Sequence, residues 1–219
     1  MFKLKRKGYE AISLLDLVKW MHGDYKFNQP VVVITFDDGF ENVYQRGFPI
    51  LQELGFSATI FLTTGYCGKY NNWPTQSAAI PRLPMLNWSQ IKEMKKFGFS
   101  FEAHTRTHPY LSQIDVSEAK LEIRHSKHDI EDRLGEPVFF FAYPYGDLNK
   151  SVYLYVKQSF QGACSVIFDL NALTCDIHLL PRLDMYYFSA IFTEKLFLSP
   201  FFKAYISSRK NLRKLRNAL

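Results

Sequence analysis

The segment 31–39, which reads VVVITFDDG, constrains the fold of this chain more than any other. Four consecutive β-branched residues are typical of a strand buried on both faces, as in the parallel sheets of α/β proteins. Because ligands of such proteins bind at the carboxyl ends of the strands, this strand is expected to deliver Asp37 and Asp38 to a binding edge. Two adjacent carboxylates repel each other, and the repulsion is tolerable when one binds a cation and the other stays free as a base. The alternative is an ordinary Asp-Gly turn.

Length and composition predict a single domain. The chain has 219 residues, and no segment rich in proline, glycine or serine divides it, so we expect one hydrophobic core. Hydrophobic residues make up 47% of the chain, which excludes disorder, and no apolar stretch approaches the ~20 residues of a membrane span. Residues 1–8, MFKLKRKG, lack the sustained apolar segment of a signal peptide. The chain as given is therefore expected to be cytoplasmic.

Positive charge is concentrated at the carboxyl terminus. The chain has 27 lysines and arginines against 21 aspartates and glutamates, and residues 203–219 hold six of the bases and no acid. Because apolar residues are interspersed, residues 201–219 are expected to form a basic amphipathic tail that contacts a membrane or another anionic surface. The alternative is a solvated terminal helix that keeps the protein soluble. No nucleic-acid-reading motif accompanies the charge, so nucleic acid is not an expected partner.

Helical and extended segments alternate along the chain, which favours a parallel sheet or barrel. Ser13 and Asn87 are expected helix N-caps. Residues 65–84 read as a long irregular loop, which we interpret as a substrate-facing lid. The expected helices cover 14–22, 43–54, 88–97, 116–134 and 150–159, and the expected strands cover 31–36, 57–61, 99–103, 138–142 and 163–168.

Two further strand ends carry distinctive residues, because the strand 99–103 ends at His104 and the strand 138–142 reaches the segment 143–146, YPYG. His104 and His108 lie four residues apart after the strand 99–103, a spacing that lets one turn of chain aim both imidazoles at one cation. Two histidines and one carboxylate leave coordination positions open for water and substrate, which is typical of a catalytic metal site. The alternative is a pair of unrelated histidines. The three cysteines are widely spaced and predict neither a disulfide framework nor a closed zinc site.

Together these motifs resemble the polysaccharide deacetylases with the NodB homology domain, also called carbohydrate esterase family 4. The resemblance covers most of the chain and is closest to the branch that N-deacetylates poly-N-acetylglucosamine. It implies an α/β fold, a distorted (β/α) barrel over residues 1–200, and metal-dependent removal of N-acetyl groups from an N-acetylated polysaccharide or oligosaccharide. The motifs that carry it are 8–12 (GYEAI), 35–39 (TFDDG), 104–111 (HTRTHPYL) and 142–146 (AYPYG).

The resemblance implies a role for each motif residue. Asp37 would be the catalytic base, and Asp38, His104 and His108 would bind a divalent cation, with Zn²⁺ expected although this set also accepts other first-row metals. The backbone N–H of Tyr145 would help to hold the oxyanion. Such a cation lowers the pKa of bound water from 15.7 to about 7, and one well-placed donor stabilises an oxyanion by on the order of 3 kcal/mol.

The chain departs from the family pattern at Ala142, where relatives often have an arginine that orients the catalytic aspartate. Arg182, in the segment LLPRL, resembles an arginine at a late position in the branch that N-deacetylates poly-N-acetylglucosamine. We therefore expect Arg182 to pair with Asp37. The alternative is an exposed arginine that follows a proline.

The general acid that must protonate the departing amine is harder to place. In the poly-N-acetylglucosamine branch, the resemblance implies that a histidine of a Tyr-His segment upstream of the equivalent of Gly8 carries this role. This chain begins only a few residues before that glycine. We therefore expect an incomplete barrel that lacks its N-terminal strand, with reduced activity. His178 is the available substitute, but we interpret it as a structural histidine.

Two other functions stay open at this point. The chain could be a glycan-binding remnant that holds the metal without turnover, for which the missing acid is the best support. It could also hydrolyse another non-peptide C–N bond with the same metal site. Substrate choice depends on loops such as 65–84, whose shape the sequence does not give.

Overall fold

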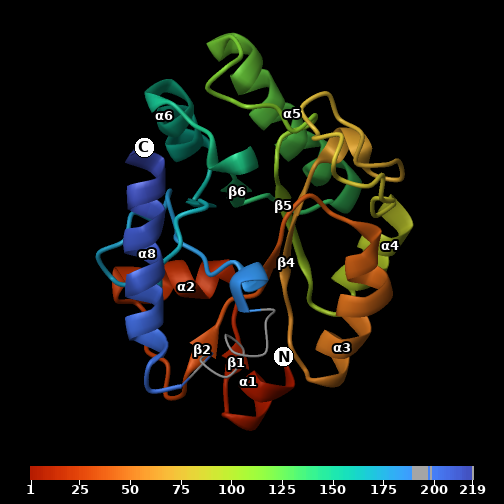
Figure 1. The fold of residues 1–219 in the computed structure, drawn as a ribbon. Coiled ribbons are helices and arrows are strands. Elements are labelled where there is room, and N and C mark those ends of the chain that lie inside the picture. The colour runs from red at the N-terminus through yellow and green to blue at the C-terminus, as the bar shows by residue number, and fades with distance from the viewer. Residues whose placement is uncertain (189–196, 198, 219) are drawn as a thin grey trace.

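Five parallel strands form the main sheet of the computed structural model, which describes residues 1–188, 197 and 199–218 (Figure 1). Each strand pairs with the next one along the chain, so every crossover moves in the same direction and the sheet curls instead of reversing its order. A parallel bridge between Cys164 and Leu180 extends the sheet at its last edge. The expected α/β fold with an incomplete barrel is confirmed. The strands are β3 (Thr35–Phe36), β4 (Thr59–Leu62), β5 (Ser100–Ala103), β6 (Phe140–Ala142) and β7 (Gly162–Cys164).

The β-branched segment is not the single buried strand that the sequence predicts. Its first half, β2 (Val31–Val32), pairs with β1 (Glu10–Ala11) in a separate parallel sheet, and its second half forms β3. Residues 31–33 are only half-buried, whereas Ile34 is buried. The segment changes partner midway, and β-branched residues indicate extended backbone without indicating which strand it pairs with.

Four expected helices are confirmed, and their ends follow the predicted caps. Ser13 forms a capping box with Asp16, and the helix ends at Gly23 with a left-handed φ of 85°. Asn87 forms a second capping box with Gln90. The four helices are α2 (Leu14–His22), α4 (Trp88–Lys95), α5 (Val116–Leu134) and α6 (Lys150–Ser159).

The expected helix 43–54 is two elements. A π-helix, η1 (Val43–Gly47), leads into α3 (Phe48–Glu53), and Pro49 lies in the first turn of α3. Proline has no N–H to donate and its ring clashes with the preceding turn, so the wider turn of η1 accommodates it where a continuous α-helix would not.

The amino-terminal end of the chain and the last strand differ from expectation, whereas the carboxyl end forms the expected helix. Residues Phe2–Arg6 form a short helix, α1, that the sequence analysis does not predict. The expected strand 163–168 is shorter, because β7 ends at Cys164 and Ser165 turns its backbone carbonyl to the Arg182 side chain. At the carboxyl end lies α8 (Phe202–Ala218), which runs along one side of the molecule (Figure 1).

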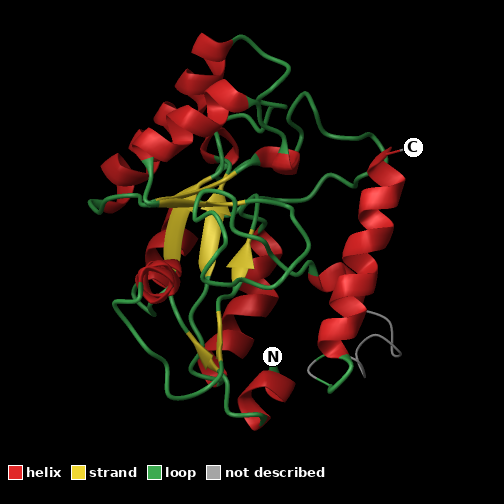
Figure 2. Ribbon diagram, turned by 90° about the vertical axis from the view of Figure 1, so that its left-hand side faces the viewer, coloured by secondary structure: helices red, strands yellow, loops and turns green. Residues whose placement is uncertain are grey.

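Alternate residues of the strands pack on opposite faces of the sheet, and helices cover both (Figure 2). On one face Ile60 and Leu62 of β4 join the largest hydrophobic cluster, which includes buried residues of α3, α4, α5 and α6. On the other face Phe61 packs with Leu17 and Val18 of α2. Both faces of the sheet are therefore withdrawn from water, and the strand ends are left for the functional loops.

A third cluster joins α8 to the body. Phe202 and Ile206 of α8 are buried with Phe168 and with Phe188 of the short helix η4 (Met185–Phe188). The first part of the expected amphipathic tail thus uses its apolar face inside the protein. Among the residues that the structure describes, no helix combines the length and hydropathy that crossing a bilayer would need.

Candidate active site

The predicted site residues meet at the carboxyl ends of the strands. Asp38 follows β3, and His104 and His108 follow β5. One Asp38 carboxylate oxygen lies 3.2 Å from Nε2 of His104 and 3.2 Å from Nε2 of His108, and the two Nε2 atoms are 3.2 Å apart. Three potential ligand atoms therefore form a nearly equilateral triangle.

This triangle fits one divalent cation. Bonds of about 2.0–2.2 Å from a common ion place neighbouring ligand atoms a little over 3 Å apart. Both imidazoles are buried, and the carboxylate is partly open to solvent. Within the described part of the chain, these three residues are the one group of histidine, cysteine and carboxylate side chains close enough to share an ion. The sequence-predicted ligand set is thus brought together.

Hydrogen bonding prepares His104 for this role. Its Nδ1 lies 2.8 Å from the carbonyl oxygen of Ala142, which accepts the ring proton and leaves Nε2 with a free lone pair. Burial and the neighbouring His104 lower the pKa of His108, which favours the neutral form that a ligand needs. Burial raises the pKa of Asp38, but the close contacts of its carboxylate with the two histidines outweigh burial and keep the pKa well below the ordinary value.

Asp37 is paired with Arg182, as the sequence predicts. Nη1 and Nη2 of Arg182 donate to the two carboxylate oxygens of Asp37 at 2.6 and 2.7 Å. Nη1 also lies 3.1 Å from Oγ1 of Thr35, and Nε donates to the carbonyl of Ser165. Burial alone would raise the pKa of Asp37, yet the guanidinium holds it below its usual range. Asp37 is therefore an ionised carboxylate in a fixed orientation.

Backbone strain is concentrated at the site. Among the described residues, the non-glycine residues with left-handed φ are Asp38, Thr105, His108 and Tyr145, with φ between 58° and 69°. Such conformations cost of order 1–3 kcal/mol each and persist only where the surroundings hold them. Three of the four are predicted site residues, and Thr105 lies between the two histidines. Strain of this kind is typical of functional sites.

Tyr145 lies in the turn η3 (Pro144–Gly146) that follows β6. Its ring packs edge-on against His108, with centroids 4.5 Å apart, and stacks on Tyr110 at 4.1 Å. Its hydroxyl contacts Trp73 and Thr75 of the long loop that precedes α4. The turn after β6, the third strand end that the sequence singles out, therefore borders the three potential metal ligands.

Comparison with known proteins identifies the family. The sequence profile of polysaccharide deacetylases matches residues 24–160, which include Asp37, Asp38, His104, His108 and Tyr145. The chain belongs to the polysaccharide deacetylase family. The fold agrees, since Streptococcus pyogenes deacetylase PplD superposes with a TM-score of 0.72 over 83% of this chain and 76% of that one, at 26% identity.

The curated relatives that this chain matches are longer than the chain itself. The poly-beta-1,6-N-acetyl-D-glucosamine N-deacetylase of Staphylococcus aureus (strain MRSA252) is 30% identical over 143 residues, which are 61% of this chain and 47% of that protein. Bacillus subtilis (strain 168) YxkH is 28% identical over 147 residues, which are 67% of this chain and 48% of its own length. The chain thus spans about half the length of the curated relatives it matches.

The structure adds a residue that supports the candidate site and that the sequence analysis missed. Glu122 of α5 accepts the backbone N–H groups of Arg106 and Thr107 at 2.8 and 2.7 Å and the Thr107 hydroxyl at 2.9 Å. It thereby holds the turn between the two histidines. A glutamate within a helix gives no sequence signal for this contact, because the contact depends on how α5 packs against β5.

His178 does not face the site. It is buried, and its Nε2 lies 3.1 Å from the carbonyl oxygen of Phe160, two residues before the opposite, amino-terminal end of β7. Its Nδ1 lies 3.9 Å from Asp176. The interpretation of His178 as a structural histidine is supported, and the general acid is not assigned to it.

Proposed function

We propose that this chain hydrolyses N-acetyl groups of an N-acetylated polysaccharide, with Zn²⁺ held by Asp38, His104 and His108. One observation carries the proposal: an Asp-His-His triangle of potential ligands lies beside a second, ionised aspartate in a member of the polysaccharide deacetylase family. A site that only binds glycan has no need of a spare carboxylate held in a fixed orientation beside the ion.

The site residues divide the work of amide hydrolysis. When bound, a divalent cation supplies a water of lowered pKa and polarises the acetyl carbonyl. Asp37 accepts the proton of the attacking water, and the two Arg182 hydrogen bonds keep its carboxylate ionised and correctly turned. The Tyr145 backbone N–H serves as a donor to the oxygen that becomes negative as the acetyl carbon becomes tetrahedral.

The proposed substrate is a glucosamine polymer of the poly-N-acetylglucosamine type. The Staphylococcus aureus relative, named for that polymer, supports this assignment at 30% identity. Oligosaccharide substrates are also proposed, because the ligand triangle borders the partly exposed aromatic pair of Tyr110 and Tyr145, where sugar rings can stack.

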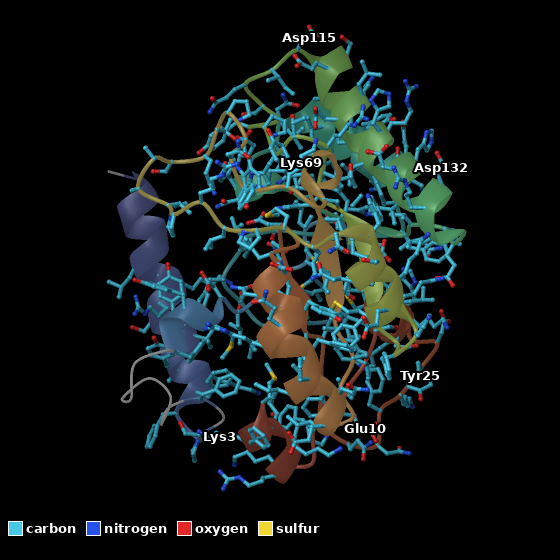
Figure 3. The ribbon with its side chains drawn as sticks, turned by 90° about the vertical axis from the view of Figure 1, so that its right-hand side faces the viewer. Lys3, Glu10, Tyr25, Lys69, Asp115 and Asp132 are labelled. Atoms are coloured by element: carbon cyan, nitrogen blue, oxygen red, sulfur yellow. The ribbon has the colours of Figure 1, made fainter. Side chains whose placement is uncertain are left out.

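Replacing the base tests the proposal. Asp37→Asn keeps the shape of the side chain and removes its basicity, so deacetylation of N-acetylglucosamine oligomers should fall at least ~100-fold, within the range for general-base catalysis. Zinc content, measured by mass spectrometry of metals, should stay at the parent level because Asp37 is outside the ligand triangle. Asp132→Asn is the matched control, since Asp132 is exposed on α5 and projects away from the body (Figure 3).

The outcomes separate the rival functions. Zinc bound and activity lost only in Asp37→Asn support the deacetylase. Zinc bound with no turnover in either form would indicate the glycan-binding remnant instead. Turnover of small cyclic amides without turnover of acetylated oligomers would indicate a hydrolase of other C–N bonds.

A further inference from the structure

The loop 69–85 is braced on itself and on the strand ends. Tyr70 pairs with Pro84 and Met85 with Phe40 in antiparallel bridges. The buried side chain of Asn71 accepts the N–H of Leu83 at 2.6 Å and donates to the carbonyl of Pro81 at 3.1 Å. The segment that the sequence predicts as an irregular lid therefore has a fixed conformation from which side chains can be aimed.

Two side chains of this loop reach the active site. Trp73 is 3% exposed, its ring lies 4.6 Å from that of His108, and its Nε1 donates to the Tyr145 hydroxyl at 3.2 Å. Oγ1 of Thr75 donates to the backbone carbonyl of His108 at 2.7 Å and lies 3.0 Å from the Tyr145 hydroxyl.

Counting protons fixes the direction of these bonds. Thr75 has a single hydroxyl proton, and the His108 carbonyl takes it because a carbonyl can only accept. The Tyr145 hydroxyl must then donate to Thr75, either to Oγ1 at 3.0 Å or to the backbone carbonyl at 3.2 Å. The hydroxyl also accepts from Trp73, so Tyr145 is held on both sides.

These contacts fall on the strained residues. His108 and Tyr145 have φ values of 59° and 58°, conformations that side-chain-bearing residues adopt only when they are held. The bond from Thr75 holds the backbone of His108 itself, and the bonds to the Tyr145 hydroxyl hold the far end of that side chain. Left free, either residue would relax toward negative φ and move its ligand atom or its amide.

We propose that Trp73 and Thr75 are positioning residues that hold a metal ligand, His108, and the oxyanion donor, Tyr145, in their working conformations. The part of this inference that concerns Tyr145 rests on the proposed function. The part that concerns His108 rests on the triangle of potential metal ligands alone. The loop thereby sets the geometry of two strand ends that lie more than 30 residues apart in the chain.

Four variants in the full chain test this proposal. Thr75→Val keeps the shape of the side chain and removes the hydroxyl, Thr75→Ser restores the hydroxyl, and Trp73→Phe removes the indole donor while keeping a ring against His108. Ser77→Ala is the control in the same loop, because the Ser77 hydroxyl contacts only the nearby backbone N–H of Ala79. We measure kcat and KM on N-acetylglucosamine oligomers, the Kd for Zn²⁺ by chelator competition, and Tm.

Thr75→Val is expected to lower kcat about 10-fold with KM within about twofold, and to weaken zinc binding about 10-fold, as losses around metal ligands typically do. Thr75→Ser should return both values to within about threefold of the parent. Trp73→Phe should lower kcat by a similar factor, and Ser77→Ala should match the parent.

A purely structural role predicts a different pattern. Variants that lose Tm but keep the parent's kcat and zinc affinity below their melting temperature would overturn the proposal. If the parent chain binds zinc but shows no turnover, the proposed function fails, and the zinc affinity of Thr75→Val still tests the role of Thr75 in holding His108. Equal zinc affinities of the parent and Thr75→Val would then overturn that role.

Discussion

At the scale of single residues, Arg182 shows how one side chain can replace another from a different part of the chain. The resemblance to the family leads one to expect an orienting arginine at position 142, where this chain has Ala142, whose side chain carries no charge. Arg182 reaches Asp37 across 145 sequence positions and engages both carboxylate oxygens. The planar guanidinium makes this contact because its two terminal N–H groups match the spacing of the carboxylate oxygens.

Arg182→Lys should therefore be far from conservative. Lysine keeps the positive charge but cannot donate in parallel to both oxygens of Asp37 and also reach Thr35. Hydrogen bonds to charged groups are worth about 1.5–3 kcal/mol, so kcat should fall roughly 10- to 100-fold. Zinc content should not change, because Arg182 contacts the base and not the ligand triangle. Arg46→Lys, at an exposed position, is the control; equal kcat in the two variants would remove the proposed role of Arg182.

At the scale of elements, the turn after β6 depends on a glycine. Gly146 has a φ of 69°, and a Cβ at this position would lie 2.2 Å from a methyl carbon of Val166. Alanine here would combine left-handed strain of roughly 1–2 kcal/mol with overpacking of about 1–3 kcal/mol. The conformation of the neighbouring Tyr145 thus relies on two independent constraints on the next residue.

Gly146→Ala should lower the free energy of unfolding by about 2–5 kcal/mol, measured by urea denaturation. Val166 is 48% exposed, so Val166→Ala alone should cost little. In the double variant the methyl clash is gone, and the left-handed strain and a tight 3.1 Å contact with Cβ of residue 166 remain, so about 1 kcal/mol should return. Effects of the two changes that simply add within ~0.5 kcal/mol would show that the clash is not the cause.

Elements also show what the sequence could and could not predict. Helix caps at Ser13 and Asn87 are local, and their structures match the prediction. Strand ends are local too, which is why the ligand set could be predicted.

Glu102 is different. It is buried in β5 and accepts the N–H groups of Phe139 and Phe140, and burial raises its pKa to about 8. Nothing near Glu102 in sequence signals this contact, because its partners lie on another strand.

The same distinction explains the rest of the site. Trp73, Thr75 and Glu122 contact residues 15 to 72 positions away, and two of the left-handed residues, His108 and Tyr145, are among those partners. The local propensities of the sequence predict neither these distant contacts nor the left-handed φ values. The pairing of Arg182 with Asp37 was predictable only through resemblance to relatives, since no local pattern connects the two residues.

At the scale of the whole molecule, α8 buries part of its apolar face against the body and carries an excess of positive charge. Phe202 and Ile206 are buried in the third cluster, Arg209 stacks on Tyr187, and Lys210 pairs with Asp169. The apolar side chains that an amphipathic helix would insert into lipid are therefore occupied in this part of α8. We propose that contact of residues 203–210 with an anionic membrane surface is electrostatic, whereas Leu212, which is 58% exposed, is an apolar residue of α8 that this cluster leaves open to solvent.

Binding to vesicles containing phosphatidylserine should consequently be weak, absent with neutral vesicles, and reversed by salt, because screening shortens from about 10 Å at 0.1 M to about 3 Å at 1 M. Replacing Arg213, Lys214 and Arg216 with glutamine should weaken binding on the order of 100-fold, at roughly 1 kcal/mol per base. The control replaces the exposed bases Arg46, Lys92 and Lys96, so that net charge falls equally. If sedimentation with vesicles drops as far in the control, only net charge attracts the protein, and residues 203–219 have no specific part in it.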